Sequence, residues 1–449
     1  MKEPIQYHNQ EELNKFLEKG VIIPEPQSVK IERSINLPQI GKSTLLHPFS
    51  RIEGEQSYID ESCEIGIAGA VTILNSGVGK GSRLGTLGPV TIKDTFTGPN
   101  TVLGCGTSEE SVFLGKETTL NDFTTGYGFR TRKGTLYEED ASSAQHTDTK
   151  MTLLLPWVTL GSNINLCDAL IAGGTGPELG AFSEVGSGSI HFNFTPSGDK
   201  ATASLFGNVV EGVFLNQERL FIGGNNCLLG PMEADFGAST AAGIRIHGKL
   251  SKGLHTGQVL SRRVFTRDFR ILSGVRKTLA TQFNYLGELC AFMNWYRQIR
   301  IGVMAQDPET RRLYEAGLRM LSLNYSERVK QLKHYFGLIE QSIILIEKEK
   351  GKTKEFENQQ FILSCWTKLE EVLEKNKTLE LPAPEKLLSE LRESLKTSDS
   401  SYTQRIRNLS PESVNLGIKW MENLKEEGGR NLSQTLTLNN CCLLYTSPS

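Results

Sequence analysis

The chain has 449 residues, more than the roughly 100–200 residues of one typical domain, so two or three structural units are expected. Hydrophobic residues make up 38% of the chain and charged residues 22%, as in ordinary globular proteins. The formal net charge of −2 argues against a dedicated nucleic-acid binder, because such proteins usually carry a basic surplus.

The segment Met1–Gly20 is polar and charged and has no apolar core beside a cleavage site, so no secretory signal is expected. The longest purely aliphatic run, Ile343–Ile346, is much shorter than a membrane span. We therefore expect a cytoplasmic protein without a membrane span. The cysteines contain no C-x-x-C pair, which favours reduced thiols over a disulfide framework or a metal site.

A degenerate six-residue repeat occupies residues 20–252, after an N-terminal lead of residues 1–19. Aliphatic or small residues recur at intervals of six in these series: Ile40, Leu46 and Ile52; Ile59, Ile65 and Val71; Val78, Leu84, Val90, Phe96 and Val102; Leu160, Leu166 and Ala172; Leu179 and Val185; Ile222, Leu228, Ala234, Thr240 and Ile246. Sandwich strands instead alternate with period two and turn every 8–12 residues. The repeat therefore predicts a mainly β fold, a left-handed parallel β-helix whose inward aliphatic side chains stack from coil to coil.

Two segments interrupt the repeat, Tyr127–Asp148 and His191–Leu205. We expect both to be loops extruded from a corner of the solenoid, where functional residues usually lie. The second segment contains Asn193, Asp199 and Lys200 together.

After Lys252 the apolar spacing changes to a helical period, which predicts an all-α domain over residues 253–428. One apolar face comprises Leu279, Phe283, Leu286, Cys290 and Met293, and another Leu332, Phe336, Ile339, Ile343 and Ile346. Further helices are expected over Phe356–Asn376, Pro384–Leu395 and Pro411–Glu426. Gly428 and Gly429 are expected to begin a tail over residues 429–449. Its last eight residues, Cys442–Ser449, resemble a translated sequencing adapter and are not expected to be native.

Hexapeptide repeats of this kind resemble the bacterial transferase superfamily of acyltransferases. Four segments are similar to the acetyltransferase half of the bifunctional enzymes that make UDP-N-acetylglucosamine: Gly20–Ile31, Arg51–Gly66, Ser183–Gly207 and Ile222–Gly243. The uridylyltransferase half needs a nucleotide-binding domain ahead of the repeats. Only the lead precedes them here, so no uridylyltransferase activity is expected from this chain.

The resemblance implies a transferase in UDP-N-acetylglucosamine or cell-envelope precursor metabolism. The acyl donor would be acetyl-CoA or another acyl-CoA, and the acceptor a sugar phosphate or nucleotide sugar. The family builds its sites between subunits, so the resemblance also implies a homotrimer.

The resemblance assigns site residues by position. Asn193 and Phe194 stand where the family has an Asn-aromatic pair, although Phe replaces the usual Tyr, and Lys200 stands where a lysine contacts the sugar phosphate. Small residues at Gly223, Gly224, Ala241 and Ala242 correspond to the corners that hold coenzyme A. Each has a simpler interpretation: Asn193 can stabilise a turn, Lys200 can be a solvated charge, and solenoid corners favour small residues anyway.

The catalytic base is the open question. Gly174 occupies the place of the family's histidine, so either His191 or His146 would have to act as the base. A basic cluster downstream would hold phosphates or form a solvated helix face, and comprises Arg262, Arg263, Arg267, Arg270, Arg276 and Lys277. Two classes of function therefore stay open: an acyltransferase, or a non-catalytic trimeric scaffold or sugar-nucleotide-binding regulator that lost the histidine.

Overall fold

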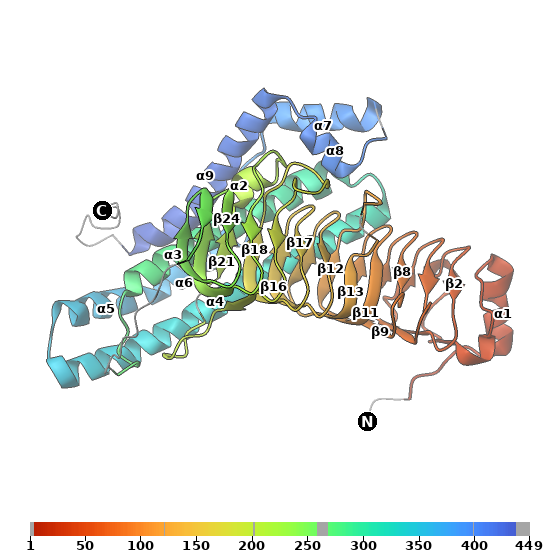
Figure 1. The fold of residues 1–449 in the computed structure, drawn as a ribbon, viewed down its shortest axis with the longest axis horizontal. Coiled ribbons are helices and arrows are strands. Elements are labelled where there is room, and N and C mark those ends of the chain that lie inside the picture. The colour runs from red at the N-terminus through yellow and green to blue at the C-terminus, as the bar shows by residue number, and fades with distance from the viewer. Residues whose placement is uncertain (1–3, 121, 201–202, 258–267, 398, 437–449) are drawn as a thin grey trace.

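The computed structural model describes residues 4–120, 122–200, 203–257, 268–397 and 399–436. Residues 30–255 form a parallel β-solenoid of about 12 turns, and a region of several helices follows it (Figure 1). The predicted fold class, a β-solenoid followed by an all-α region, is therefore confirmed.

Each coil contributes strands to three parallel sheets. The first sheet contains β2 (Leu45–Leu46), β5 (Glu64–Ile65), β8 (Arg83–Leu84), β15 (Ser142–Ser143), β17 (Thr159–Leu160), β19 (Glu184–Val185), β22 (Phe221–Ile222), β24 (Ala238–Thr240) and β26 (Gly253–His255). The second contains β1 (Lys30–Ile31), β3 (Arg51–Glu53), β6 (Val71–Leu74), β9 (Val90–Lys93) and β20 (Ile190–Phe192). The third contains β4 (Tyr58–Ile59), β7 (Gly77–Val78), β10 (Phe96–Thr97), β12 (Ser111–Phe113), β14 (Thr135–Tyr137) and β21 (Ser204–Phe206).

Longer strands bend around a corner and belong to two sheets. β11 (Val102–Glu109) and β13 (Thr125–Thr131) join the first sheet to the second. β16 (Asp148–Leu154), β18 (Asn165–Ile171), β23 (Cys227–Ala234) and β25 (Arg245–Leu250) join the second sheet to the third. We call the edge between the first and second sheets the first corner, and the edge between the second and third sheets the second corner.

The repeat phase identifies most of the interior correctly. Leu46, Ile65 and Leu84 stack in register on the inner face of the first sheet and are fully buried. Some predicted interior positions are wrong. Leu179 is 93% exposed. Phe96 and Val102 point outward, because the residues that follow them, Thr97 and Leu103, pair in register with the buried Val78 and Leu84.

The predicted extruded loop over Tyr127–Asp148 is also wrong. These residues form a regular coil built from β13, β14 and β15. Its interior positions hold hydroxyl-bearing and aromatic side chains in place of most of the aliphatic ones, which hid the repeat. Thr131, for example, donates to Ser108 Oγ at 2.6 Å. By contrast, the segment after β20 does leave the coil, since 11 residues separate Phe192 from Ser204.

A short helix, α1 (Gln10–Lys19), packs against the N-terminal end of the solenoid through buried Leu13 and Phe16. Asn9 and Glu12 form a capping box at its start, and Gly20 ends it in the left-handed conformation that glycine adopts without strain. The N-terminal lead is thus part of the folded structure.

The helical region contains α3 (Val275–Asn294), a π-helical continuation η3 (Trp295–Met304), α4 (Pro308–Lys350), α5 (Lys354–Ser364), α6 (Trp366–Asn376), α7 (Glu385–Thr397), α8 (Tyr402–Arg407) and α9 (Pro411–Thr435). A one-turn helix, α2 (Val209–Gly212), lies within the solenoid and packs against α3. The predicted boundary at 429 is too early, because α9 continues through Gly428 and Gly429. Both glycines pack closely on α3, where a Cβ on Gly428 would lie 3.0 Å from Cys290 Sγ.

The helices cover the outer face of the third sheet. Its outward residues form one ladder in register: Tyr58, Gly77, Phe96, Val112, Leu136, Leu153, Leu170, Leu205, Glu233 and Lys249. From Val112 to Leu205 these residues are apolar, buried and part of one core shared with α3 and α4. The helical region is therefore joined to the solenoid through a continuous apolar interface.

A buried charge network reinforces this interface. Arg300 of η3 donates to both oxygens of Glu139, at 2.6 and 2.9 Å, and to Glu138 Oε1 at 2.9 Å. Tyr296 donates its hydroxyl to the same Glu138 oxygen at 2.7 Å, and the Tyr402 ring lies 3.8 Å from the guanidinium carbon. All of these charges are nearly inaccessible to solvent, so their mutual pairing must offset a large desolvation cost.

Candidate functional site

The second corner carries the one predicted loop that the structure extrudes. Neighbouring coils turn there through single residues in the left-handed conformation, such as Met151 and Asp168. In the next coil the same corner expands into a loop that begins at Asn193 and is described as far as Lys200. Helix α4 runs along this corner, where Asn324 donates to the Gly134 carbonyl at 2.7 Å. The loop therefore emerges beside α4.

Asp168 anchors the loop to the helix. Its carboxylate accepts hydrogen bonds from the Arg328 guanidinium of α4 and from the Asn193 side-chain amide. Arg328 also donates from Nη1 to the Lys200 carbonyl at 3.1 Å. Burial raises the pKa of Asp168 above its ordinary value, and the adjacent Arg328 opposes that rise. Asn193 is thus held as a loop anchor, as its turn-stabilising interpretation suggests.

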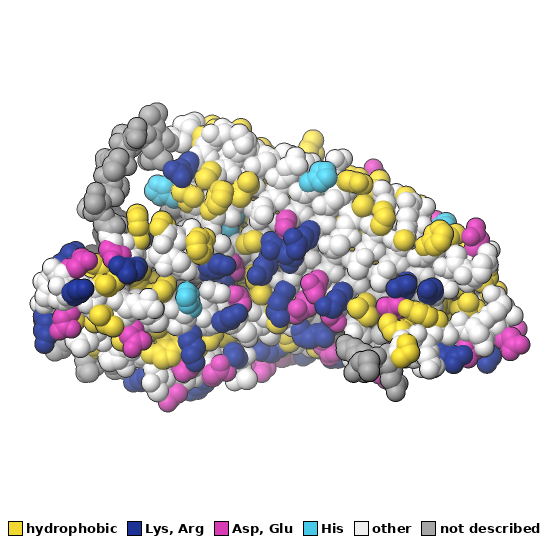
Figure 2. All heavy atoms as spheres, turned by 90° about the horizontal axis from the view of Figure 1, so that it is seen from below, with side chains coloured by type: hydrophobic (Ala, Val, Ile, Leu, Met, Phe, Trp, Pro, Cys, Tyr) yellow, Lys and Arg dark blue, Asp and Glu magenta, His cyan; other side chains and the backbone are white. Residues whose placement is uncertain are grey.

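Two lysines add positive charge near this anchor. Lys150 and Lys200 both act electrostatically on Asp168, and neither has a carboxylate partner in the described part of the chain. On the adjacent strands, Arg132 pairs with Asp148 at 2.7 Å. Figure 2 shows Lys and Arg side chains gathered near the middle of this face of the solenoid. The surface beside the loop therefore offers cations with unfilled hydrogen-bonding capacity for an anionic ligand.

Within the loop, Asp199 is a structural residue. It accepts from Thr195 Oγ1 at 2.7 Å and from Ser197 Oγ at 3.0 Å, which closes the turn. Phe194 is 64% exposed, and the Lys200 ammonium lies 5.8 Å from its ring centroid. The predicted substrate-binding pair, Phe194 and Lys200, is therefore brought together on the outside of the loop.

His191 lies beneath the loop, inside the solenoid wall. Its Nδ1 donates to the Cys167 carbonyl at 2.6 Å, because a carbonyl can only accept. Its Nε2 then accepts from the Ser204 hydroxyl at 2.8 Å, and Ser204 in turn accepts from the Met232 amide at 2.9 Å. Burial lowers the pKa of His191 to about 4. In this arrangement the imidazole is neutral, and both of its nitrogens are engaged.

His146 is exposed at the first corner, edge-on to the Tyr127 ring with centroids 5.7 Å apart. The loop leaves from the second corner, so the second sheet separates His146 from it within one chain. The structure therefore does not bring His146 together with Asn193 or Lys200.

The four predicted cofactor-binding residues lie close together at one corner of the solenoid. Gly223, Gly224, Ala241 and Ala242 stack at the first corner, where a Cβ on Gly223 would lie 2.6 Å from the Ala241 carbonyl group. Coil packing alone therefore accounts for glycine at 223. Ala242 is exposed, and among the described residues no atom beyond the chain neighbours lies within 4 Å of the Cβ position of Gly243. The described part of this edge therefore has room for an extended ligand such as the arm of coenzyme A.

Sequence reasoning missed Asp168 and Arg328. The two are 160 residues apart, in a strand and in a helix, and no local motif marks either one. In the predicted basic cluster, Arg262, Arg263 and Arg267 lie outside the described residues, whereas Arg270 pairs with Asp268 at 2.6 Å. No group of three or more His, Cys, Asp or Glu side chains is arranged to hold a metal ion among the residues that the structure describes.

No protein-family model matches the chain, and no curated protein matches it. The fold and the loop therefore define a class by structure alone: a parallel β-solenoid with a docked helical region and an anchored corner loop. Within the described ranges, none of the helices is long and apolar enough to cross a membrane.

Proposed function

We propose that the chain binds a sugar phosphate or nucleotide sugar at the loop of residues 193–200, with Lys150 and Lys200 contacting the phosphate. The observation that carries this proposal is the pair of lysines beside the Asp168–Arg328 anchor, neither of which has a carboxylate partner among the described residues. An ammonium group binds phosphate as a compact point charge, and Asp168 is already committed to Arg328 and Asn193. The exposed Phe194 ring is available to pack against the ligand's apolar face.

The geometry favours binding over acid–base catalysis by His191. A general base must reach the proton that it removes, and both nitrogens of His191 are occupied inside the wall. The first role proposed for this chain is therefore that of a sugar-phosphate-binding protein, of the scaffold or regulator class.

Acyl transfer is the second candidate, supported by the open edge at Ala242 and Gly243. An acyl-CoA bound there would supply an activated thioester; the acceptor amine or hydroxyl would gain the acyl group, and coenzyme A would leave as the thiol with the proton that the acceptor loses. The edge and the loop lie at opposite sides of the second sheet, so such chemistry would require a neighbouring subunit in a homotrimer.

Calorimetric titration with UDP-N-acetylglucosamine and with glucosamine 1-phosphate tests the binding proposal. We expect Lys200→Ala and Lys150→Ala each to weaken binding by about 1.5–3 kcal/mol, the range for a hydrogen bond to a charged group. Lys80→Ala is the control, because Lys80 is exposed elsewhere and pairs with Glu61. Failure of the wild-type chain to bind either ligand would reject the proposal.

An acyl-CoA turnover assay separates the two candidates. Turnover that survives in His191→Gln would support acyl transfer and exclude His191 as its base. Binding that depends on Lys200, without turnover from any acyl-CoA, would support the non-catalytic role.

A further inference from the structure

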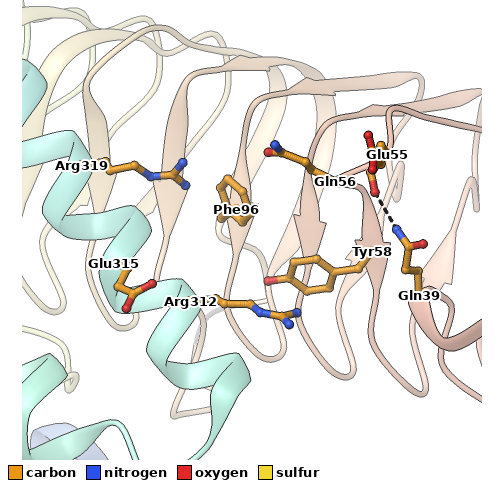
Figure 3. A pocket seen from close by; sticks show the side chains of 8 residues that line it. All are labelled: Gln39, Glu55, Gln56, Tyr58, Phe96, Arg312, Glu315 and Arg319. Carbon is orange, nitrogen blue, oxygen red and sulfur yellow. Dashed lines mark hydrogen bonds between the residues drawn. The ribbon is translucent and has the colours of Figure 1, made fainter. Parts of the chain in front are cut away.

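A hollow lies between the N-terminal half of α4 and the early coils of the solenoid, far from the loop. Its volume is about 560 Å³, within the roughly 300–1,000 Å³ typical of small-molecule sites. The lining residues are Gln39, Glu55, Gln56, Tyr58, Phe96, Arg312, Glu315 and Arg319 (Figure 3). A further hollow of about 420 Å³ shares Gln56, Phe96 and Arg319 with it, so the two form one groove.

The floor of the groove is the uncovered end of the outward ladder on the third sheet. Tyr58, Gly77 and Phe96 precede Val112, where the buried apolar interface begins. Glycine at 77 is required, because a Cβ there would lie 2.4 Å from the Tyr58 ring. Tyr58 therefore lies flat over Gly77, and its ring centroid is 6.4 Å from that of Phe96. The groove has an ordered aromatic floor.

Two arginines of α4 lie over this floor. The Arg312 guanidinium is 5.9 Å from the Tyr58 ring centroid, and that of Arg319 is 4.9 Å from the Phe96 centroid. In the described part of the chain, neither guanidinium has a hydrogen bond or an ion pair. Arg300 and Arg328, which face the solenoid further along, are both paired with carboxylates. Arg312 and Arg319 are therefore pre-oriented donors whose in-plane N–H groups have no protein acceptor.

The remaining polar groups suit a hydroxylated ligand. Burial raises the pKa of Tyr58 to about 12, so its hydroxyl stays protonated and can donate. Gln56, Glu55 and Glu315 have no hydrogen-bond or ion-pair partner through their side chains within the described residues, and Figure 3 shows Glu315 projecting from α4 between the two arginines. Carboxylates accept hydrogen bonds from hydroxyl groups, whereas the arginine forks match oxyanions.

We propose that this groove binds a small hydroxylated organic anion, whose phosphate or carboxylate groups are held by Arg312 and Arg319 and whose hydroxyls meet Gln56, Glu55 and Glu315. The two arginines are seven residues apart, about 10.5 Å along the helix axis, so a ligand with anionic groups at both ends fits better than a single phosphate ion. The groove site is independent of the loop site, because the two share no residue.

Equilibrium titration with three probes tests the proposal: fructose 1,6-bisphosphate, citrate and uncharged fructose. We expect at least one of the two anions to bind at the groove, and fructose not to bind at the same concentrations. The arginine variants below separate this binding from any binding of the bisphosphate at the loop. Binding of the bisphosphate alone assigns phosphate as the anionic group, and binding of citrate alone assigns carboxylate. Absence of binding by both anions at millimolar concentration would overturn the proposal.

The double variant Arg312→Gln/Arg319→Gln should lower the affinity for the anion at least about tenfold, as expected for loss of charge-assisted hydrogen bonds. Arg311→Gln, the exposed neighbour on the same helix, should bind as wild type. If the double variant does not fold by circular dichroism, the Arg312→Lys/Arg319→Lys variant replaces it; it keeps the charge, loses the fork and should still bind more weakly. Unchanged affinity in a folded double variant would place the anion elsewhere and reject the groove.

Discussion

Arg328 of α4 donates to the Asp168 carboxylate across 160 residues of sequence, and both side chains are almost completely buried. The same carboxylate accepts from Asn193, and the same guanidinium holds the Lys200 carbonyl. One ion pair thus fixes both ends of the loop segment that carries Phe194. The helical region therefore positions the loop as well as covering the third sheet.

The first prediction concerns this ion pair. Asp168→Ala leaves the Arg328 charge buried without a counter-ion, which costs about 3–5 kcal/mol in comparable pairs. We expect a large fall in the urea midpoint and increased proteolytic cleavage within residues 193–203. Asp148→Ala is the control, because Asp148 pairs with Arg132 at the surface and should cost about 1 kcal/mol or less. Equal effects of the two substitutions would show that Asp168 does not anchor the loop.

The sequence predicts the solenoid well because each coil repeats the same local requirement, an inward side chain followed by a tight corner. The prediction of interior positions failed where other residue types fill the interior or where the inward position moves along the strand. Thr131, which donates to Ser108, and other hydroxyl-bearing and aromatic residues occupy the interior there, so no aliphatic period is visible. Phe96 has the right spacing but the wrong direction, because the interior position moves by one residue to Thr97.

The site was less predictable than the fold. Lys200 and Asn193 were proposed because an interruption of the repeat marks a loop and because their positions match those of the resembled family. Asp168 and Arg328 could not be found, since their pairing depends on how α4 docks along the second corner. Likewise, the groove depends on Arg312 lying over Tyr58, which no periodicity encodes.

The second prediction is a homotrimer. Phe49, Leu87 and Tyr127 are 70%, 47% and 47% exposed along the first corner, which leaves an apolar edge available for subunit contact. Light scattering should give about three times the mass of the chain. A triple Phe49→Ser/Leu87→Ser/Tyr127→Ser variant should shift toward monomer, and a wild-type chain that is monomeric at micromolar concentration would contradict the prediction.

The third prediction follows from His191. Its pKa is lowered from the ordinary 6.5 to about 4, so between these values the unfolded chain binds more protons than the folded one. The stabilisation from the neutral ring is complete above about pH 6.5 and is lost as the pH falls toward 4, on the order of 3 kcal/mol. The contribution of His191 to the melting temperature, measured as the difference between the wild-type chain and His191→Gln, should therefore fall on acidification. His191→Gln keeps a donor and an acceptor but does not titrate, so its melting temperature should lack this acid-dependent loss. If the wild-type chain and the variant had identical pH profiles, the folded state would not hold a buried, neutral imidazole at position 191.

The last prediction concerns Glu138, whose contribution to stability depends on pH in the opposite direction to that of His191. Burial raises the pKa of Glu138 from 4.5 to about 7; Arg300 opposes this rise and the nearby Glu139 adds to it. One guanidinium faces two carboxylates, so one of the two glutamates keeps its proton far into the neutral range. Here the folded state binds the extra proton, and stability is greatest below about pH 4.5 and falls as the pH rises through 7.

Glu138→Gln imitates the protonated carboxyl and can still accept from Tyr296 and Arg300. The His191 contribution is the same in this variant and in the wild-type chain. We therefore expect the melting temperature of Glu138→Gln to rise relative to that of the wild-type chain between pH 5 and 7.5. Glu139→Gln is the matched control: it removes the carboxylate that holds Arg300 through two hydrogen bonds, so it should destabilise the chain by about 3–5 kcal/mol across the same pH range. If Glu138→Gln is destabilised as strongly as Glu139→Gln at pH 7, both carboxylates are ionised in the folded state and Arg300 needs both.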